Sequence, residues 1–392
     1  MPAGGCGHHG GVADLGPTLL DAYRPGSFLF ASPTETLLAT GARVTVAETD
    51  PDDLVARVGK LMGEEGVPIA VGALPFDTRT APHLVLPRSV RRAGPVHAAL
   101  AGTRREPVTG SCRTTPVPSE VDFERAVGDA VRRLRAGELD KVVLARSLRV
   151  DTGGDVDLPA LLRNLARVNP HGYTFAADLP HAGVGTRTLL GATPELLLRR
   201  TGNTVLTNPL AGSMPRVVGD PEADRAAADT LFASAKDRRE HAVVVDHVVR
   251  TLTPFCHSLD VPTEPSLVAA PSVWHLATRI TGVLADPGVS SLRLASALHP
   301  TPAVCGAPRA AANALIAELE PVDRGYYAGA VGWCAANGDG EWAVAIRCAD
   351  VRPGTVRMYA GAGIMPDSDP ARELAETTAK FGVLRRAMGL LD

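Results

Sequence analysis

Short strand-like runs and helix-like patterns alternate irregularly along this chain, and that order limits the folds it can adopt. One long helix is expected at residues 229–252. Strands are expected at residues 189–198, 274–284, 326–333, 342–350 and 355–360. No segment repeats at a fixed period. The pattern predicts one α+β domain with a large sheet core and peripheral helices.

Helix signals are clearest from residue 119 onward. Ser119 precedes a first turn with acidic residues, and Gly137 supplies a stop signal before the strand expected at Lys141. Asp369-Pro370 forms a good start for a C-terminal helix that should reach Met388. The first helix should bury one apolar stripe, made of Phe123, Val127, Ala130, Val131 and Leu134.

The N-terminal part is less regular. Glycines crowd the opening residues, so residues 1–15 are expected to form a disordered tail. Residues 85–118 are rich in Arg, Pro and Ser and are expected to form a surface connection. No later linker is long enough to separate domains. We therefore expect a single domain over residues 16–392, with the chemical motifs at residues 119–385.

Composition excludes several function classes. A net charge of −3 provides no basic excess to neutralise phosphates, so nucleic acid is not expected as a partner. No apolar run approaches the ~20 residues that span a bilayer, so no membrane association is expected. The start of the chain lacks a secretory pattern, and its six cysteines form no CxxC pair. These features predict a cytoplasmic protein with reduced thiols.

Lysine is scarce in this chain. Only four of forty basic residues are lysine, namely Lys60, Lys141, Lys236 and Lys380. A GC-rich genome explains the excess of arginine, and under that bias lysines should persist where a guanidinium fails. Arg cannot release its proton at usable pH, whereas a desolvated Lys can become a neutral base. Three of the four lysines lie in segments that look like sites, so we expect an enzyme.

The C-terminal helix carries the sharpest local signal. Glu373, Glu376 and Lys380 are spaced by three and four residues, so their side chains share one helical face. Just upstream, Gly361 and Gly363 would let backbone N–H groups approach an anion. Carboxylates beside an anion pocket suit Mg²⁺, which leaves its other positions to water and substrate. A solvent-exposed salt-bridge ladder is the alternative that this spacing leaves open.

Two further charged residues lie on apolar faces. Glu240 shares a helical face with Val244 and Val248, so it needs a partner, either a metal ion or an arginine. Lys141 shares one face of its strand with Val143. In a dry pocket, desolvation would lower the pKa of the Lys141 amine and prepare it as a general base. A lysine at a strand end that reaches solvent is the structural alternative.

Glu195 and two histidines complete the candidates. Glu195 follows Thr193-Pro194 at the corner of an apolar strand. Among leucines the pKa of its carboxyl would be raised, so it could serve as a general acid, unless it is an exposed edge residue. His275 and His299 also lie in apolar surroundings. A lone histidine of this kind is more often a core residue than a catalyst.

Eight short motifs between residues 139 and 380 resemble, in the same order, the chorismate-utilising enzymes, which include isochorismate, salicylate, anthranilate and aminodeoxychorismate synthases. The likeness is strongest to isochorismate synthases of the catechol-siderophore type, and it implies their two-sheet β core flanked by helices. The motifs are Lys-Val-Val-Leu-Ala-Arg, Gly-Ala-Thr-Pro-Glu-Leu-Leu, Pro-Leu-Ala-Gly-Ser, Lys-Asp-Arg-x-Glu-His, Trp-His-Leu-Ala-Thr, His-Pro-Thr-Pro-Ala-Val-Cys-Gly, Gly-Ala-Gly-Ile and Glu-x-x-Glu-Thr-x-x-Lys.

The resemblance implies chorismate as substrate and Mg²⁺ as cofactor. Glu240 and Glu376 match the family's metal ligands, with Glu373 close by and binding through water. Lys141 matches a base that deprotonates water for attack at ring carbon C2, and Glu195 matches an acid that protonates the hydroxyl leaving from C4. The substrate-binding residues that it implies are Gly212, His275, Ala303, Tyr327, Arg347, Gly361, Gly363 and Lys380.

The function that this implies is isochorismate synthase, an isomerase feeding 2,3-dihydroxybenzoate and siderophore biosynthesis. Relatives that use ammonia lack a lysine at the position of Lys141, which favours water as the nucleophile. Salicylate synthases share the lysine and then eliminate pyruvate, so they are the enzymatic alternative. A catalytically idle family member that binds chorismate is the alternative from another class. Chorismate is the only partner expected, and the chain is expected to be a monomer.

Overall fold

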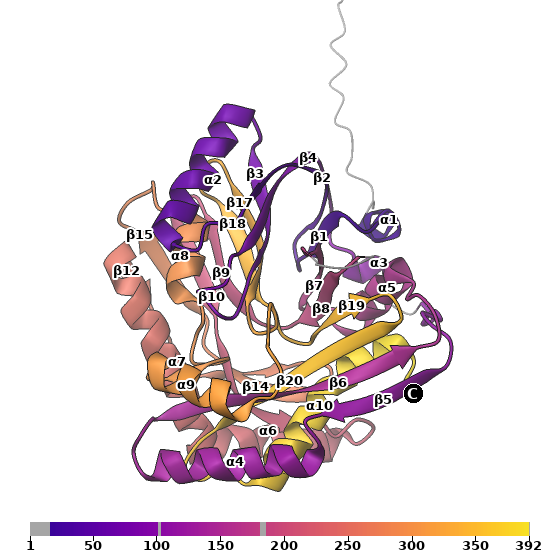
Figure 1. Ribbon diagram of the computed structural model, residues 1–392. Helices are drawn as coiled ribbons and strands as arrows, with labels where there is room; N and C mark the ends of the chain where they lie inside the picture. Colours follow the sequence, from indigo (N-terminus) through magenta and orange to yellow (C-terminus); the bar gives the residue numbers. More distant parts are fainter. Residues whose placement is uncertain (1–15, 101–102, 181–185, 392) are drawn as a thin grey trace, which may run out of the picture.

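Antiparallel strands dominate the computed structural model, which describes residues 16–100, 103–180 and 186–391 (Figure 1). Most of them form one continuous hydrogen-bonded sheet. Its pairings run in the order β5 (Cys112–Val117), β6 (Lys141–Thr152), β20 (Thr355–Ile364), β19 (Cys348–Arg352), β8 (Thr188–Thr193), β7 (Tyr173–Asp178), β1 (Ser27–Ala31), β2 (Thr36–Val46), β4 (His83–Ala93), β3 (Ile69–Leu74), β17 (Ala330–Ala335), β18 (Gly340–Val344), β9 (Leu196–Thr201), β10 (Thr204–Asn208), β15 (Ile280–Leu284) and β12 (Cys256–Asp260).

Two smaller strand groups complete the β structure. The short β16 (Gly306–Ala307) pairs with the start of β6, on the edge opposite β20. A separate sheet has β14 (Val273–Ala277) between β11 (Leu210–Pro215) and β13 (Ser266–Ala269). The structure therefore contains two sheets, as the resemblance implied.

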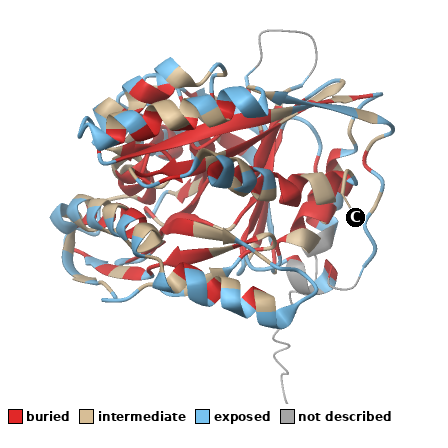
Figure 2. Ribbon diagram, turned by 90° about the horizontal axis from the view of Figure 1, so that it is seen from below, coloured by how far each residue is buried: buried red, intermediate tan, exposed pale blue. Residues whose placement is uncertain are grey.

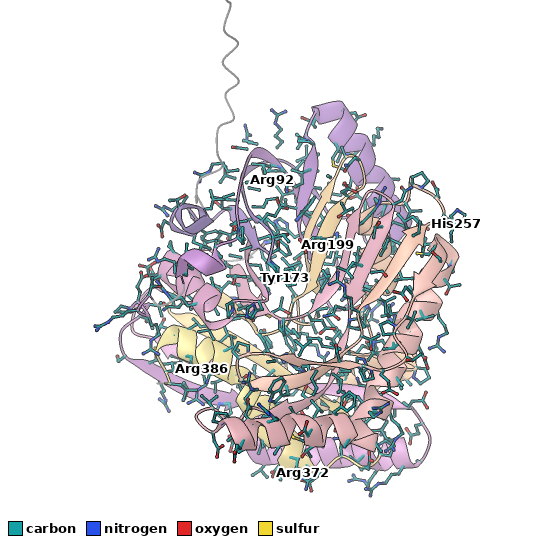
Figure 3. The ribbon with its side chains drawn as sticks, turned by 180° about the vertical axis from the view of Figure 1, so that it is seen from behind. Arg92, Tyr173, Arg199, His257, Arg372 and Arg386 are labelled. Carbon is teal, nitrogen blue, oxygen red and sulfur yellow. The ribbon has the colours of Figure 1, made fainter. Side chains whose placement is uncertain are left out.

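Helices flank the strands, and several of them expose their outer faces (Figure 2). The C-terminal helix can be followed from behind between Arg372 and Arg386, near its two ends (Figure 3). In chain order the helices are α1 (Gly16–Asp21), α2 (Pro51–Glu65), α3 (His97–Leu100), α4 (Glu120–Arg135), α5 (Leu158–Val168), α6 (Pro221–Ala233), α7 (Ala235–Leu252), the 3-10 turn η1 (Thr253–Phe255), α8 (Ser291–Leu298), α9 (Arg309–Leu319) and α10 (Pro370–Met388).

Two helices begin and pack as their sequences predict. In α4 the side chain of Ser119 accepts the N–H of Asp122, and all five residues of the predicted stripe are buried. In α10 the side chain of Asp369 accepts the N–H of Arg372, and the helix ends at Met388. Such caps satisfy backbone N–H groups that have no partner inside a helix.

Three predicted elements are interrupted. The helix expected at residues 229–252 is two helices, because Ser234 ends α6 and caps α7. Residues 274–284 form β14 and β15, which belong to different sheets. Residues 342–350 divide between β18 and β19. In each case the apolar pattern continues from the end of one element into the start of the next, so periodicity alone does not locate the boundary between them.

The expectation of a surface connection at residues 85–118 is wrong. This segment continues β4 and contains α3 and β5. Apart from half-buried ends, the side chains of β5 are exposed, and β6 is its only strand partner among the described residues. An edge strand with exposed side chains can have the polar, arginine-rich sequence typical of a loop.

The predicted fold class is confirmed: one large α+β domain has a two-sheet β core flanked by helices. Among the described residues, no helix is both long and apolar enough to cross a bilayer. The predicted tail at residues 1–15 lies outside the described residues.

Candidate active site

One cavity collects most of the predicted site residues. Elements from distant parts of the chain line it, including β6, β20, β11, β14, α7 and α10. The predicted residues that line it are Glu195, Gly212, Glu240, His275, Ala303, Tyr327, Arg347, Gly361, Gly363 and Lys380. Lys141 and Glu376 contact lining residues, whereas Glu373 lies further out, bonded to Lys236.

Lys141 is the first residue of β6 and is fully buried, which rules out a lysine that reaches solvent. Its Nζ lies 3.0 Å from Oε1 of Glu240, an ion-pair distance. Side chains alternate along a strand, so Lys141 shares its face with Val143, which lines the cavity. The side chain that pairs with Glu240 is therefore the candidate base and not an arginine.

Glu195 lies in the tight connection between β8 and β9, the corner expected from Thr193-Pro194. Its side chain is buried, so the exposed-edge alternative is wrong. Burial raises the pKa of its carboxyl to about 7, although the N–H of Leu210 and the charge of Arg347 act in the opposite direction. That N–H donates to Oε1 over 3.4 Å. Glu195 therefore holds a proton at neutral pH more readily than an exposed glutamate.

Three glutamates beside the cavity each contact a different lysine. Glu240 of α7 contacts Lys141, and Glu376 of α10 accepts a hydrogen bond from Lys380 over 2.5 Å. Glu373 accepts one from Lys236 over 2.7 Å. The last pair joins the first turns of α7 and α10, the two helices that carry the three carboxylates.

These pairs are buried or half-buried, so the predicted alternative of a solvent-exposed salt-bridge ladder is wrong. Glu373 is 1% exposed and Lys380 is 8% exposed. Burial and the neighbouring Glu376 raise the pKa of Glu373 to about 7. Burial also opposes ionisation of Glu240, but the charge of Lys141 holds its pKa below the ordinary value. The arrangement is a buried carboxylate cluster neutralised by lysines.

The donors in this cluster fit a hard cation, because all three side chains offer carboxylate oxygens. In the present arrangement, no three His, Cys, Asp or Glu side chains of the described residues are grouped as a metal site. Each carboxylate is turned toward an ammonium group instead. A divalent cation would need to replace part of that positive charge.

Arg347 is oriented by a buried hydrogen-bond chain. Its Nη2 lies 2.9 Å from Nε2 of His275, and Nδ1 of His275 lies 2.8 Å from Oγ of Ser213. A guanidinium only donates, so Nε2 must accept and Nδ1 must carry the proton. Burial and the charge of Arg347 hold the pKa of His275 well below its ordinary value, which keeps the ring neutral. Ser213 then has its own hydroxyl hydrogen free to donate.

The backbone of Arg347 is unusual as well. Its φ of 48° lies in the left-handed region, which non-glycine residues rarely adopt. The residue follows β18 and precedes β19, where the chain turns beside the cavity. Observed strain of this kind concentrates at functional sites, and here it aims a buried guanidinium into the pocket.

The cavity glycines make room for other side chains. A Cβ at Gly363 would lie 2.1 Å from Oε1 of Glu240, and one at Gly361 would lie 2.8 Å from the hydroxyl of Tyr327. The carbonyl of Gly361 accepts a hydrogen bond from Lys380 over 2.9 Å. These two glycines therefore let α7 and Tyr327 approach β20 closely, a role that the sequence argument about anions did not include.

Sequence reasoning missed two residues of this region. Ser213 lines the cavity and bonds His275, and Lys236 holds Glu373. Both lie inside quoted motifs, so the signal was present but was not assigned to them. His299 donates from Nε2 to the carbonyl of Pro75 over 2.8 Å, which makes it a satisfied core histidine.

Known proteins resemble this chain over nearly its whole length. Isochorismate synthase DhbC of Bacillus subtilis is 45% identical over 95% of this chain and 96% of its own length. The vibriobactin-specific isochorismate synthase of Vibrio cholerae is 37% identical over 97% of this chain and 96% of its own length. The crystal structure of DhbC from Bacillus anthracis matches with a TM-score of 0.91 at 43% identity, covering 96% of this chain and all of that one.

The family comparison agrees with these relatives. The family described as "Chorismate binding enzyme" matches residues 91–389, a range that contains every residue of the cavity described above. A match over this share of the sequence, together with relatives above 30% identity along its length, establishes membership. The chain belongs to the family of chorismate binding enzymes.

Proposed function

We propose that this protein is an isochorismate synthase, an isomerase that adds water at C2 of chorismate while the C4 hydroxyl leaves. The observation that carries the proposal is a pair of buried titratable groups beside one cavity. Lys141 offers an amine, and Glu195 offers a carboxyl whose pKa is raised to about 7. A general acid and a general base beside one cavity are what such a substitution requires. The relatives described above carry this activity in their names.

In the proposed reaction, Lys141 takes a proton from the attacking water. The amine must be neutral to do so, and the proton of its ion pair with Glu240 must leave first. Glu195 gives its proton to the C4 oxygen, which departs as water. One C–O bond forms and one breaks, so the substrate and product have the same composition. General acid catalysis and general base catalysis of this kind each raise the rate roughly 10²- to 10⁴-fold.

The proposed contacts with substrate follow the lining of the cavity. Arg347, with the backbone of Gly361 and Gly363, holds the enolpyruvyl carboxylate, and Tyr327 assists. Lys380 lies near the ring carboxylate. The residues proposed to surround the ring are Gly212, His275 and Ala303. The buried guanidinium and ammonium groups would fix the dianion in one orientation, which lowers the entropy cost of reaction.

We also propose Mg²⁺ as the cofactor, held by Glu240 and Glu376, with Glu373 binding through water. The oxygen-only donors and their burial support this set. When bound, the ion would neutralise and orient the ring carboxylate of the substrate. The chain's own lysines would then exchange partners, since Lys141 and Lys380 now contact two of these glutamates.

The cavity must widen to accept a substrate. Its volume is only 40 Å³, far below the several hundred Å³ typical of ligand sites. The lysine–glutamate pairs occupy part of this region, so their rearrangement is the change we expect on binding. We further propose a single catalytic domain over residues 16–392, a monomer with chorismate as its only partner, a cytoplasmic location and a role in 2,3-dihydroxybenzoate and siderophore biosynthesis.

The purified protein with chorismate and Mg²⁺ tests this function, with the product identified by HPLC and NMR. We expect isochorismate in equilibrium with chorismate, and loss of turnover when EDTA removes the metal. Salicylate with pyruvate would instead identify a salicylate synthase. Binding of chorismate without any turnover would identify an idle family member.

A further inference from the structure

A second cavity lies on the same face of the large sheet as the catalytic cavity. It is formed where β6, β20 and β19 run side by side, the sheet region that Figure 1 shows above α4 and α10. Its volume is 390 Å³. We call it the arginine groove, and it is lined by Arg149, Asp350, Arg352, Pro353, Thr355, Arg357 and Tyr359.

The arginine groove leads toward the catalytic cavity along β20. Because side chains alternate along a strand, Arg357, Tyr359 and Gly361 point to one face. Tyr359 lines both cavities, and its ring stacks on Tyr327 with centroids 4.9 Å apart. Arg357 and Gly361 are four residues apart, or roughly 13 Å. Tyr359 therefore separates a molecule in the groove from the proposed substrate site.

Positive charge is in excess in this groove. Arg149 and Arg357 are directly opposite each other across β6 and β20, a placement of like charges that destabilises a sheet. Asp151 contacts Arg149, and Asp350 contacts Arg352.

Arg357 differs from the other two arginines of the groove in its ion pairs. No ion pair of Arg357 with a carboxylate occurs among the residues that the structure describes, and its side chain is half-buried. Asp350 also contacts Arg187, so it cannot neutralise the groove by itself. The groove is thus built to attract an anion that the protein does not supply.

We propose that the arginine groove collects the dianionic substrate and passes it beyond Tyr359 into the catalytic cavity. This inference rests on the proposed function, because chorismate carries two carboxylates and fits the charge of the groove. A cleft lined by one sign of charge raises the local concentration of an oppositely charged substrate. Arg357 is the residue that should matter most, because Asp350, directly opposite it on β19, already pairs with Arg187 and Arg352. Arg357 also lies closest in sequence to Tyr359.

The size of the effect follows from Coulomb attraction. In water, a unit positive charge about 13 Å from a dianion attracts it enough to raise the equilibrium constant for its binding about threefold. Reversing the charge should double the logarithm of that change, to about tenfold. Screening sets its salt dependence, because the Debye length falls from about 30 Å at 0.01 M to about 3 Å at 1 M.

A charge series at position 357 tests the proposal through kcat/KM for chorismate. At low ionic strength, R357K should stay near the wild type, R357Q should fall about threefold and R357E about tenfold, with kcat unchanged in all three. At 1 M salt the variants should converge. R125Q is the matched control, because it removes an exposed arginine from α4, and it should behave as the wild type at both salt concentrations.

Equal kcat/KM across the series at low salt would overturn the proposal, and so would a loss of kcat or a salt-independent difference. Calorimetric titration of chorismate into each variant separates this result from failure of the proposed function. If chorismate is consumed, or binds, but affinity ignores the charge at position 357, only the arginine groove is refuted. If the wild type neither binds nor consumes chorismate, both proposals fall.

Discussion

Glu195 and Glu240 are buried glutamates beside the same cavity, yet their surroundings shift the pKa values of the two carboxyls in opposite directions. Burial raises the pKa of Glu195 to about 7, and a long backbone hydrogen bond from Leu210 and the charges of Arg347, Lys141 and Lys380 oppose it without cancelling it. Burial acts on Glu240 as well, but Lys141 at 3.0 Å outweighs it and holds the pKa below the ordinary value. One carboxyl is thus prepared to give a proton and the other to hold a cation.

The pH profile should report Glu195 directly. Its raised pKa means that the carboxyl is protonated below about pH 7 and loses its proton as the pH rises through that value. If it is the general acid, kcat/KM should fall above about pH 7. The variant Glu195→Gln cannot donate this proton, so it should lose roughly 10²- to 10⁴-fold in kcat together with the alkaline limb. An unchanged limb in the variant would assign the titration to another group.

Replacing Lys141 tests the base. Lys141→Met keeps an unbranched side chain in a fully buried position but removes the amine, so turnover should fall by at least about 10²-fold while chorismate still binds. Calorimetry and a product assay measure the two effects separately. Lys60→Met is the control, because Lys60 is exposed and forms a surface ion pair with Glu64. Turnover that survives in Lys141→Met would remove Lys141 from the mechanism.

Single residues were predicted unevenly from the sequence. Scarcity of lysine pointed to Lys141 and Lys380, and burial confirms that neither is an ordinary surface charge. The Glu376–Lys380 pair follows from their spacing on one helix, but the partners of Lys141 and Lys236 were not predictable, because those pairs join different elements. Lys236 and Glu373, for example, are joined across α7 and α10. Spacing along one helix cannot reveal contacts between two.

At the level of elements, a capping signal in the sequence marks the start of α7. Ser234 is followed three residues later by Asp237, and its side chain accepts the N–H of that residue. This spacing is a helix-start signal, and it places Lys236 in the first turn and Glu240 in the second. Apolar periodicity continues from α6 into α7, so periodicity alone predicts one long helix.

The edge of β6 is completed by an ion pair instead of a strand. Between the short β16 and β5, the N–H of Ala145 donates to Glu320 over 2.7 Å, and the carbonyl of Val143 accepts from Arg324 over 2.7 Å. Arg324 also donates to the carbonyl of Val304, which lines the cavity. Glu320 and Arg324 are both buried and paired with each other. They tie the strand that carries Lys141 to Val304, another residue of the cavity lining.

Breaking this pair should be costly. Arg324→Met leaves Glu320 buried without its partner, so the free energy of unfolding should fall by about 3–5 kcal/mol. Arg133→Met is a matched control, because it removes an arginine that contacts Glu318 at the surface, and it should cost less than about 1 kcal/mol. Urea denaturation measures both. Equal losses in the two variants would show that the buried pair has no special role.

For the whole molecule, the sequence predicted the class of fold but not its topology. Irregular order of strands and helices indicated α+β, and the two-sheet core is observed. The strand order could not be predicted, because neighbours such as β3 and β17 lie far apart in the chain. The active site depends on this order. Its walls come from residues between Val143 and Lys380, which only the complete sheet brings together.

Metal binding should be visible in the stability of the whole molecule. A ligand that binds only the folded state raises the free energy of unfolding, by about 2.7 kcal/mol at a hundredfold excess over Kd. Mg²⁺ should therefore raise the Tm in a thermal melt, and EDTA should reverse the rise. Glu376→Gln removes a proposed ligand and should lose most of this shift. A rise of equal size in the variant would contradict the proposed ligand set.

Reaction in ¹⁸O-labelled water tests the central claim most directly, because the proposed reaction takes its new hydroxyl from solvent. Mass spectrometry and NMR of the product should show isochorismate with one ¹⁸O atom, located at the C2 hydroxyl. Isochorismate without label would mean that the hydroxyl moved within the substrate, and it would contradict the roles of Lys141 and Glu195. Formation of any other product would contradict the proposed activity itself.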